Sequence, residues 1–287
     1  MKIKRKCVLA VLVLALAIPG FAGPSRDNSN QSGSSQAGSA QPSAAAYTIE
    51  VAGSTSVTPL MEQLAEAYAA VKPNVKVNIN GTGSSDGIRA AGAGTSEVGM
   101  SSRELTPAEK GSGLRELIIA IDGIAVIVNN NNPLANVSVP QIRDIYSGRI
   151  TDWSQVSPGK SGKIAVVSRE PGSGTRGAFE ELIELKDQLV LGATEFDGTG
   201  AIKAEISRNA DAIGYISLGS VDASVKTVNI EGVAASTANV VNGSYRISRP
   251  FILLTKREVH QETQQFLDWI MSAAGQNIVK KSWIAVR

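Results

Sequence analysis

Four short segments rich in serine, threonine and glycine contain the side chains in this sequence that are best suited to bind a small anion. Each follows an apolar stretch and precedes a stretch with helical patterning, so each is expected at the start of a helix. Helix N-termini offer free N–H groups and a partial positive charge, hydroxyl groups can donate hydrogen bonds, and glycine lets the backbone approach a ligand closely. Arg169 lies just before the last segment and can make a bidentate contact. The segments are residues 54–56, 81–87, 101–103 and 172–176.

Each segment alone has a simpler interpretation, because serine and threonine before a helix are commonly N-caps without a ligand. Four such segments in one chain favour convergence on an anion. Neither common nucleotide-binding motif is present: no glycine precedes Lys-Ser or Lys-Thr at P-loop spacing, and Asp86 stands at the third glycine position of the dinucleotide pattern that begins at Gly81. The sequence therefore predicts an anion site of a different kind.

A serine hydrolase is the enzymatic alternative. Residues 83–87 match the pattern G-x-S-x-G, with Ser85 at the nucleophile position, and acidic residues and then His260 follow in hydrolase order. His260 has polar neighbours at the start of an amphipathic stretch, which favours a solvated first helical turn over a catalytic base. We therefore expect no catalytic residues, and the hydrolase that uses Ser85 and His260 stays open as the less favoured alternative.

The composition limits the cofactors and partners that the chain can use. One histidine and one cysteine are too few for most zinc sites or for an internal disulfide, so we expect no metal and no cofactor. Of the 28 basic residues, four lie within the first six positions, and the remaining 24 face 26 acidic residues. This balance and the aromatic content of 5% argue against a nucleic-acid partner.

The N-terminus has the pattern of an export signal followed by a tether. Residues 1–23 combine a basic start, a short apolar region and a small-residue end, which is typical of a secretory signal peptide. Residues 24–46 are rich in serine, glycine and glutamine, which predicts a disordered tether. Cys7 precedes the apolar region, so it does not provide a lipid attachment site. The sequence predicts an exported protein at the cell surface or in the periplasm; an uncleaved membrane anchor stays open.

From residue 47 onward, strand and helix patterns alternate. Apolar residues at helical or alternating spacing, with Pro and Gly between them, predict an α/β protein with mostly parallel sheets. The strands are expected near residues 47–51, 75–79, 118–128, 164–167, 212–218 and 251–254, and the helices near residues 58–72, 142–146, 177–191 and 260–281.

The four segments, taken in this order, resemble the phosphate loops of the solute-binding protein of the phosphate ABC transporter. The resemblance is carried by residues 53–59, 81–87, 98–104 and 168–176, and residues 212–215 are also typical of the family. It implies a two-lobed periplasmic-binding-protein-like type II fold with a ligand cleft between the lobes. The apolar strands at 118–128 and 245–254 border the middle of the chain, which gives lobe 1 as residues 47–125 plus 247–287 and lobe 2 as residues 126–246.

The resemblance also implies a function and a set of ligands. The protein is expected to be a monomer that binds inorganic phosphate outside the cytoplasm and delivers it to ABC transporter permease subunits, with attachment to the membrane through the tether or the permease. Sulfate, molybdate or tungstate, and a role as an adhesin or sensor, remain alternatives. Carried over by motif position, the residues expected to contact phosphate are Thr55, Ser56, Ser84, Arg169, Ser173, Gly174 and Thr175.

Two further residues are candidates for the phosphate site because the sequence differs from the family pattern at one position. Ser102 stands where many members have Asp, which leaves open the group that accepts the phosphate proton. Asp86, two residues past Ser84, is a candidate acceptor, and a role in capping its own helix is the alternative. Arg103 and Arg176 are expected to brace neighbouring carboxylates rather than to bind the ligand.

Overall fold

The computed structural model describes residues 46–185 and 188–287 of the chain. The predicted signal peptide and almost all of the predicted tether therefore lie outside the described residues. Within the described part, no helix has the length and apolar character needed to cross a membrane.

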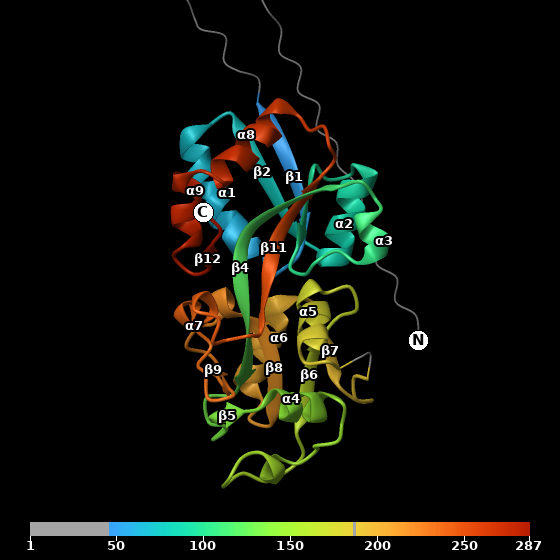
Figure 1. Cartoon of the computed structure of the whole chain (residues 1–287), viewed down its shortest axis with the longest axis vertical. Coiled ribbons are helices and arrows are strands. Elements are labelled where there is room, and N and C mark those ends of the chain that lie inside the picture. The colour runs from blue at the N-terminus through green and yellow to red at the C-terminus, as the bar shows by residue number, and fades with distance from the viewer. Residues whose placement is uncertain (1–45, 186–187) are drawn as a thin grey trace, which may run out of the picture. The chain divides into compact units, whose positions relative to one another are not determined.

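Most strands of the described chain belong to one ten-stranded sheet with the order β2-β1-β3-β11-β4-β8-β6-β7 (Figure 1). Two short strands, β9 and β12, pair with β4 off this path, and β5 pairs with β10 separately. The bounds are β1 Tyr47–Gly53, β2 Val75–Gly81, β3 Val98–Ser101, β4 Arg115–Val128, β5 Asn136–Val137, β6 Ala165–Arg169, β7 Thr194–Phe196, β8 Ala212–Ser217, β9 Lys226–Thr227, β10 Asn229–Ile230, β11 Ser248–Thr255 and β12 Ile284–Ala285.

The sheet is mixed, so the prediction of mostly parallel sheets was wrong. β1 is parallel to β2 and β3, and β6 is parallel to β7 and β8. The two central strands run in opposite directions: β11 is antiparallel to β3 and β4, and β4 is antiparallel to β8. The physical reason lies in the path of the chain. It runs along β4 from the group of β1, β2 and β3 to the group of β6, β7 and β8, and it returns along β11, which pairs with β4.

Helices cover both faces of the sheet. The helix predicted at 177–191 begins earlier and ends at Leu182, because Glu184 adopts a left-handed backbone conformation (φ 57°) that a helix cannot continue. The region at 260–281 is two helices, and Ser272 caps the second. The bounds are α1 Thr58–Val71, α2 Ser84–Ala93, α3 Pro107–Lys110, α4 Val139–Tyr146, α5 Gly174–Leu182, α6 Gly198–Arg208, α7 Thr237–Val241, α8 Gln261–Ile270 and α9 Ala273–Val279, with single 3-10 turns at Trp153–Gln155 and Leu218–Ser220.

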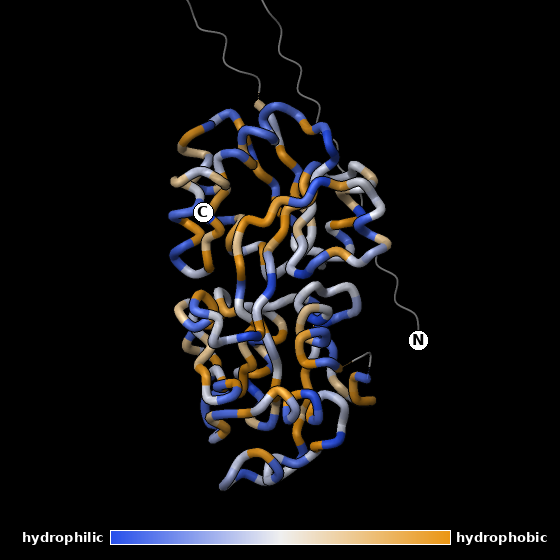
Figure 2. Tube along the Cα trace, viewed as in Figure 1, coloured by the Kyte–Doolittle hydropathy of each residue, from blue (hydrophilic) through white to orange (hydrophobic). Residues whose placement is uncertain are grey.

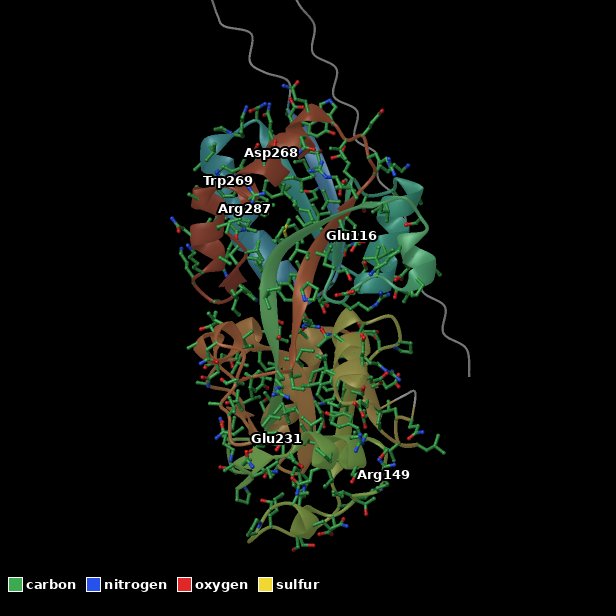
Figure 3. All side chains as sticks on the ribbon, in the orientation of Figure 1. Glu116, Arg149, Glu231, Asp268, Trp269 and Arg287 are labelled. Carbon is green, nitrogen blue, oxygen red and sulfur yellow. The ribbon has the colours of Figure 1, made fainter. Side chains whose placement is uncertain are left out.

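The hydrophobic residues form separate clusters, and β4 and β11 contribute to more than one of them. Ile119 and Ala120 of β4 pack in a cluster with α1 and α8, whereas Ile124 and Val126, further along the same strand, pack in a cluster with α4 and α5. Figure 2 shows hydrophobic residues along both long strands. Charged residues such as Glu116, Arg149, Glu231 and Asp268 are exposed (Figure 3).

Candidate anion-binding site

Two groups of parallel strands end beside each other and place the hydroxyl-rich segments. Gly53, at the end of β1, is in register with Gly81 of β2 and with Met100 of β3, so the segments that follow these strands start at one edge. On the other side of the site, Arg169 at the end of β6 is in register with Phe196 at the end of β7. The carboxyl ends of parallel strands are where α/β proteins commonly bind ligands.

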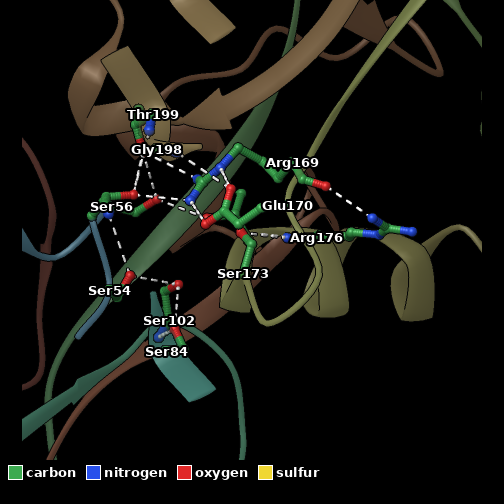
Figure 4. Close-up of polar contacts among 12 residues, drawn as sticks. Ser54, Ser56, Ser84, Ser102, Arg169, Glu170, Ser173, Arg176, Gly198 and Thr199 are labelled. Atoms are coloured by element: carbon green, nitrogen blue, oxygen red, sulfur yellow. Dashed lines mark hydrogen bonds and ion pairs between the residues drawn. The ribbon is translucent and has the colours of Figure 1, made fainter. Parts of the chain in front are cut away.

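Hydroxyl groups from both sides meet in a buried cluster (Figure 4). Ser56 Oγ lies 2.7 Å from Thr175 Oγ1 and 3.1 Å from Thr199 Oγ1. Ser54 Oγ donates to Ser102 Oγ at 2.8 Å. Six members of the cluster are buried: Ser54, Ser56, Ser84, Ser102, Thr175 and Thr199. Such a concentration of buried hydroxyls exceeds what helix capping requires, and it forms a cluster of groups that can all donate hydrogen bonds.

Ser102 connects three of the segments. Its N–H donates to Ser84 Oγ at 3.1 Å, and its hydroxyl lies 3.4 Å from the same atom while accepting from Ser54. Gly174, the first residue of α5, packs directly against this group, and a Cβ at that position would overlap Ser84 Oγ and lie 2.7 Å from Ser102 Oγ. Glycine at this position therefore allows the N-terminus of α5 to approach the serines closely.

Arg169 is the cation of the site and is 1% exposed. Glu170 occupies one edge of its guanidinium, accepting from Nε and Nη2 at 2.7 Å each. The remaining donors point to the hydroxyl cluster: Nη2 donates to Thr55 Oγ1 at 3.0 Å, and Nη1 donates to Thr199 Oγ1 at 3.3 Å. Glu170 therefore fixes the guanidinium so that its Nη1–Nη2 edge, which suits a bidentate oxyanion contact, faces the hydroxyls.

Tyr215 contacts the backbone of Arg169. Its hydroxyl lies 2.9 Å from Ser168 Oγ and accepts from the Arg169 N–H at 3.4 Å. Its ring stacks on Phe179 of α5 at 3.9 Å between centroids. Burial raises the pKa of Tyr215 to about 12, so the phenol stays neutral at physiological pH. The typical segment at residues 212–215 thus holds β6 and α5 together behind the cation.

Arg103 and Arg176 brace carboxylates, as predicted. Arg103 donates to both oxygens of Glu109 at 2.7 and 2.8 Å. These hydrogen bonds are the main cause that lowers the pKa of Glu109 to about 2. Arg176 pairs with Glu180 and Glu195, each at 2.8 Å.

The remaining predicted residues lie near the cluster in different ways. Ser173 is buried and caps α5, its hydroxyl accepting from the Arg176 N–H at 3.3 Å. Asp86 pairs with Arg89, keeps 46% of its side chain exposed, and lines an open cavity of about 690 Å³ together with Thr55 and Glu170. Its carboxylate thus faces the mouth of the site rather than the hydroxyl cluster.

Three members of the site were missed as contact residues. Ser54 is in the first predicted segment but was not assigned a contact. Thr199 follows a strand and a glycine at the start of α6, the same local pattern as the four recognised segments, and this signal was available in residues 196–199. Glu170 stands next to Arg169, and sequence does not show which way either side chain points.

The structure separates the residues of the hydrolase alternative. Ser85 Oγ accepts from Arg103 Nη2 at 3.2 Å beside the end of β2. His260 stacks on Tyr47 at the start of β1, 4.1 Å between ring centroids, and pairs with Glu262. Seven residues of β1 separate the two ends of the strand, which is about 20 Å at ~3.3 Å per residue. Among the described residues, no group of three His, Cys, Asp or Glu side chains could hold a metal ion.

Comparisons with known proteins agree on one family. The PBP superfamily domain matches residues 38–274. A putative phosphate ABC transporter substrate-binding protein with bound phosphate, from Clostridium perfringens, is 46% identical; the match covers 84% of this chain and all of that one, with a TM-score of 0.82. An ABC-type phosphate transport receptor from Vibrio cholerae is 35% identical over 83% of this chain and 99% of that one, with a TM-score of 0.70. The phosphate-binding protein PstS 2 of Streptococcus pneumoniae is 49% identical over 108 residues. This match spans 38% of this chain and 37% of that protein.

Proposed function

We propose a function for this chain, which belongs to the PBP superfamily and, within it, to the substrate-binding proteins of phosphate ABC transporters. It binds inorganic phosphate on the extracytoplasmic side of the membrane and delivers the ion, chemically unchanged, to the permease of an ABC transporter. The observation that carries this proposal is the buried cluster of hydroxyls around the Nη1–Nη2 edge of Arg169. Relatives named for phosphate binding and phosphate transport support the choice of ligand.

The chemistry of the site suits binding and release. Phosphate oxygens accept hydrogen bonds, and the cluster offers serine and threonine hydroxyls, the N-termini of α2 and α5, and one guanidinium. Hydrogen bonds to a charged group contribute about 1.5–3 kcal/mol each, so several of them exceed the ~8 kcal/mol of a micromolar complex. The excess offsets the removal of water from the ion and the ordering of the protein.

We further propose that the site is a cleft between two lobes, with boundaries at residues 47–125 plus 247–287 and 126–246. The separate hydrophobic clusters support a division near these boundaries, because the chain changes cluster between Ala120 and Ile124 on β4 and between Ile247, which precedes β11, and Phe251 of β11. Lobe 1 then provides Thr55, Ser56, Ser84 and Ser102 to the phosphate, and lobe 2 provides Arg169, Ser173, Gly174 and Thr175. We add Thr199 to the second set, because its hydroxyl lies beside Ser56 and Arg169. The hydrogen bond between Ser56 and Thr175 then joins the two lobes.

The group that receives the phosphate proton belongs to the same proposal. Ser102 can accept through its hydroxyl oxygen, and it contacts Ser54 and Ser84. Asp86 lines the mouth of the site and acts through its negative charge rather than by direct contact with the cluster. Export of the protein, a tether at residues 24–46 and a monomeric state complete the proposal.

Calorimetry with a panel of oxyanions tests the function. Inorganic phosphate should bind one-to-one and raise the unfolding temperature more than sulfate, molybdate or tungstate at the same concentration. The ligand that binds most tightly stabilises the folded protein most, and a ligand at 100 times its Kd stabilises it by about 2.7 kcal/mol. Ser56→Ala, which removes a buried hydroxyl, should weaken phosphate binding. Ser207→Ala is the control, since that exposed hydroxyl donates only to the Ala204 carbonyl. If another oxyanion stabilised the protein more than phosphate does, phosphate would not be the preferred ligand.

A further inference from the structure

A buried ion pair lies outside the hydroxyl cluster, on the two central strands. Asp122 of β4 and Arg249 of β11 face each other as register partners, and they are 1% and 3% exposed. Arg249 donates to Asp122 Oδ2 from Nη2 at 3.2 Å and from Nε at 3.4 Å. No local sequence pattern joins these two residues, because they are 127 positions apart.

The pair sits where the two central strands change hydrophobic cluster. On β4, Ala120 packs with α1 and α8, and Ile124 packs with α4 and α5; Asp122 lies between them. Around Arg249 the order is reversed: Ile247, the residue before β11, belongs to the second cluster, and Phe251 of β11 belongs to the first. The pair therefore lies at the boundary between the two clusters.

Each partner also holds a different part of the molecule. Arg249 Nη1 donates to the Ser102 carbonyl at 3.1 Å. Asp122 Oδ1 accepts from Ser217 Oγ, at the end of β8, at 2.8 Å. One continuous chain of polar contacts therefore runs from β8 through Asp122 and Arg249 to the backbone of Ser102.

We propose that Asp122 and Arg249 are positioning residues for the phosphate site: Arg249 holds the Ser102 backbone and, through it, aligns the hydroxyls of Ser54 and Ser84. The inference rests on the proposed function, since it concerns the affinity for phosphate. Ser102 contacts both of these serines, so a shift of its backbone displaces donors from three segments at once.

The choice of residue types supports positioning over stabilisation. A buried ion pair contributes little net stability, because removing two charges from water opposes their attraction. Burial raises the pKa of Asp122 and lowers that of Arg249 to about 10, which shows that both charges are costly in this place. A planar guanidinium can donate to a carboxylate and to a carbonyl at the same time, in fixed directions, which a lysine ammonium does less well.

Two variants separate positioning from folding. Arg249→Lys keeps the charge and should fold, but its single ammonium cannot hold Asp122 and the Ser102 carbonyl in the same geometry. Asp122→Leu with Arg249→Met removes both charges and leaves neither partner buried alone, and such replacements are often neutral or stabilising. Arg143→Lys is the matched control, because Arg143 pairs with Glu184 at the surface, 3.2 Å apart.

Titration with inorganic phosphate measures the effect. Arg249→Lys and the double variant should bind phosphate roughly tenfold or more weakly, the size expected for one misplaced charge-assisted hydrogen bond. Their thermal unfolding without phosphate should stay cooperative, hydrogen exchange of residues 98–104 should accelerate, and Arg143→Lys should behave as wild type. Wild-type affinity in either folded variant would overturn the positioning role. Absence of phosphate binding by the wild-type protein would instead refute the proposed function, and the inference with it.

Discussion

Replacement of Arg169 by alanine should weaken phosphate binding more than the loss of any single hydroxyl. The guanidinium is buried, two of its N–H groups are held by Glu170, and its remaining edge faces Thr55 and Thr199. Arg169→Ala removes the donors that face the anion and also leaves the Glu170 carboxylate, 18% exposed, beside the anion without its counter-charge. Both consequences oppose binding.

The expected magnitude follows from this geometry. Truncating one partner of a buried charge pair costs about 2–5 kcal/mol, or roughly 30- to 4,000-fold in Kd at about 1.4 kcal/mol per tenfold. Thr55→Ala removes one half-buried hydroxyl, whose hydrogen bond to a charged ligand contributes about 1.5–3 kcal/mol, or roughly 12- to 140-fold in Kd. Arg169→Ala also leaves Glu170 unpaired, so its loss should lie toward the upper end of its range and exceed that of Thr55→Ala in a direct comparison.

Isothermal titration with phosphate at fixed ionic strength is the assay, and thermal unfolding without phosphate confirms that each variant is folded. Arg103→Ala is the matched control, because Arg103 also makes two hydrogen bonds to a carboxylate, Glu109. Its guanidinium donates to Ser85, which is outside the hydroxyl cluster. Adding Glu170→Gln to Arg169→Ala should recover part of the lost affinity by removing the unpaired charge. An Arg169→Ala variant no weaker than Thr55→Ala would refute the assignment of Arg169.

Four further outcomes follow from the structure. Asp86→Asn should narrow the preference for phosphate over sulfate in competition titrations, and unchanged selectivity would remove Asp86 from the site. Small-angle scattering should show a smaller radius of gyration with saturating phosphate; an equal radius would count against closure of the lobes. The pKa of Glu109 falls from 4.5 to about 2 in the folded protein, so its hydrogen bonds with Arg103 stabilise above pH 4.5 and lose this effect as the pH falls through 2. Without phosphate, the difference in unfolding temperature between wild type and Glu109→Gln should therefore shrink over this range, and a constant difference would contradict the pairing. His260→Ala should leave phosphate affinity unchanged, and ester hydrolysis that disappears in this variant and in Ser85→Ala would favour an enzyme.

The hydroxyl segments could be predicted because their causes are local. A strand followed by glycine, serine or threonine and then a helix is visible within a dozen residues. The C-terminal ends of the parallel strands β1, β2 and β3 then bring the first three segments to one edge. Thr199 has the same pattern but follows β7, a strand of only three residues without a clear apolar signal.

The direction of the central strands could not be predicted in the same way. β4 contains a continuous buried run over residues 122–128, which shows burial but not the direction of the neighbouring strands. The pairing of β4 with β11 joins Asp122 to Arg249, and neither residue has a charged neighbour in sequence that would reveal its partner. The mixed sheet and the buried ion pair therefore depend on the same long-range contact.

The charges around the site explain how it can both bind and release an anion. Arg169 pairs with Glu170, and Arg249 pairs with Asp122, so the two buried guanidinium groups bring no net charge. Burial is the main cause of the lowered pKa of Arg249, and repulsion from Arg169 contributes to it. The two carboxylates balance the charges of the buried cations when no phosphate is bound. Because both pairs are neutral, phosphate bound as proposed can leave the hydroxyls and helix N-termini to water without an unpaired buried charge remaining behind.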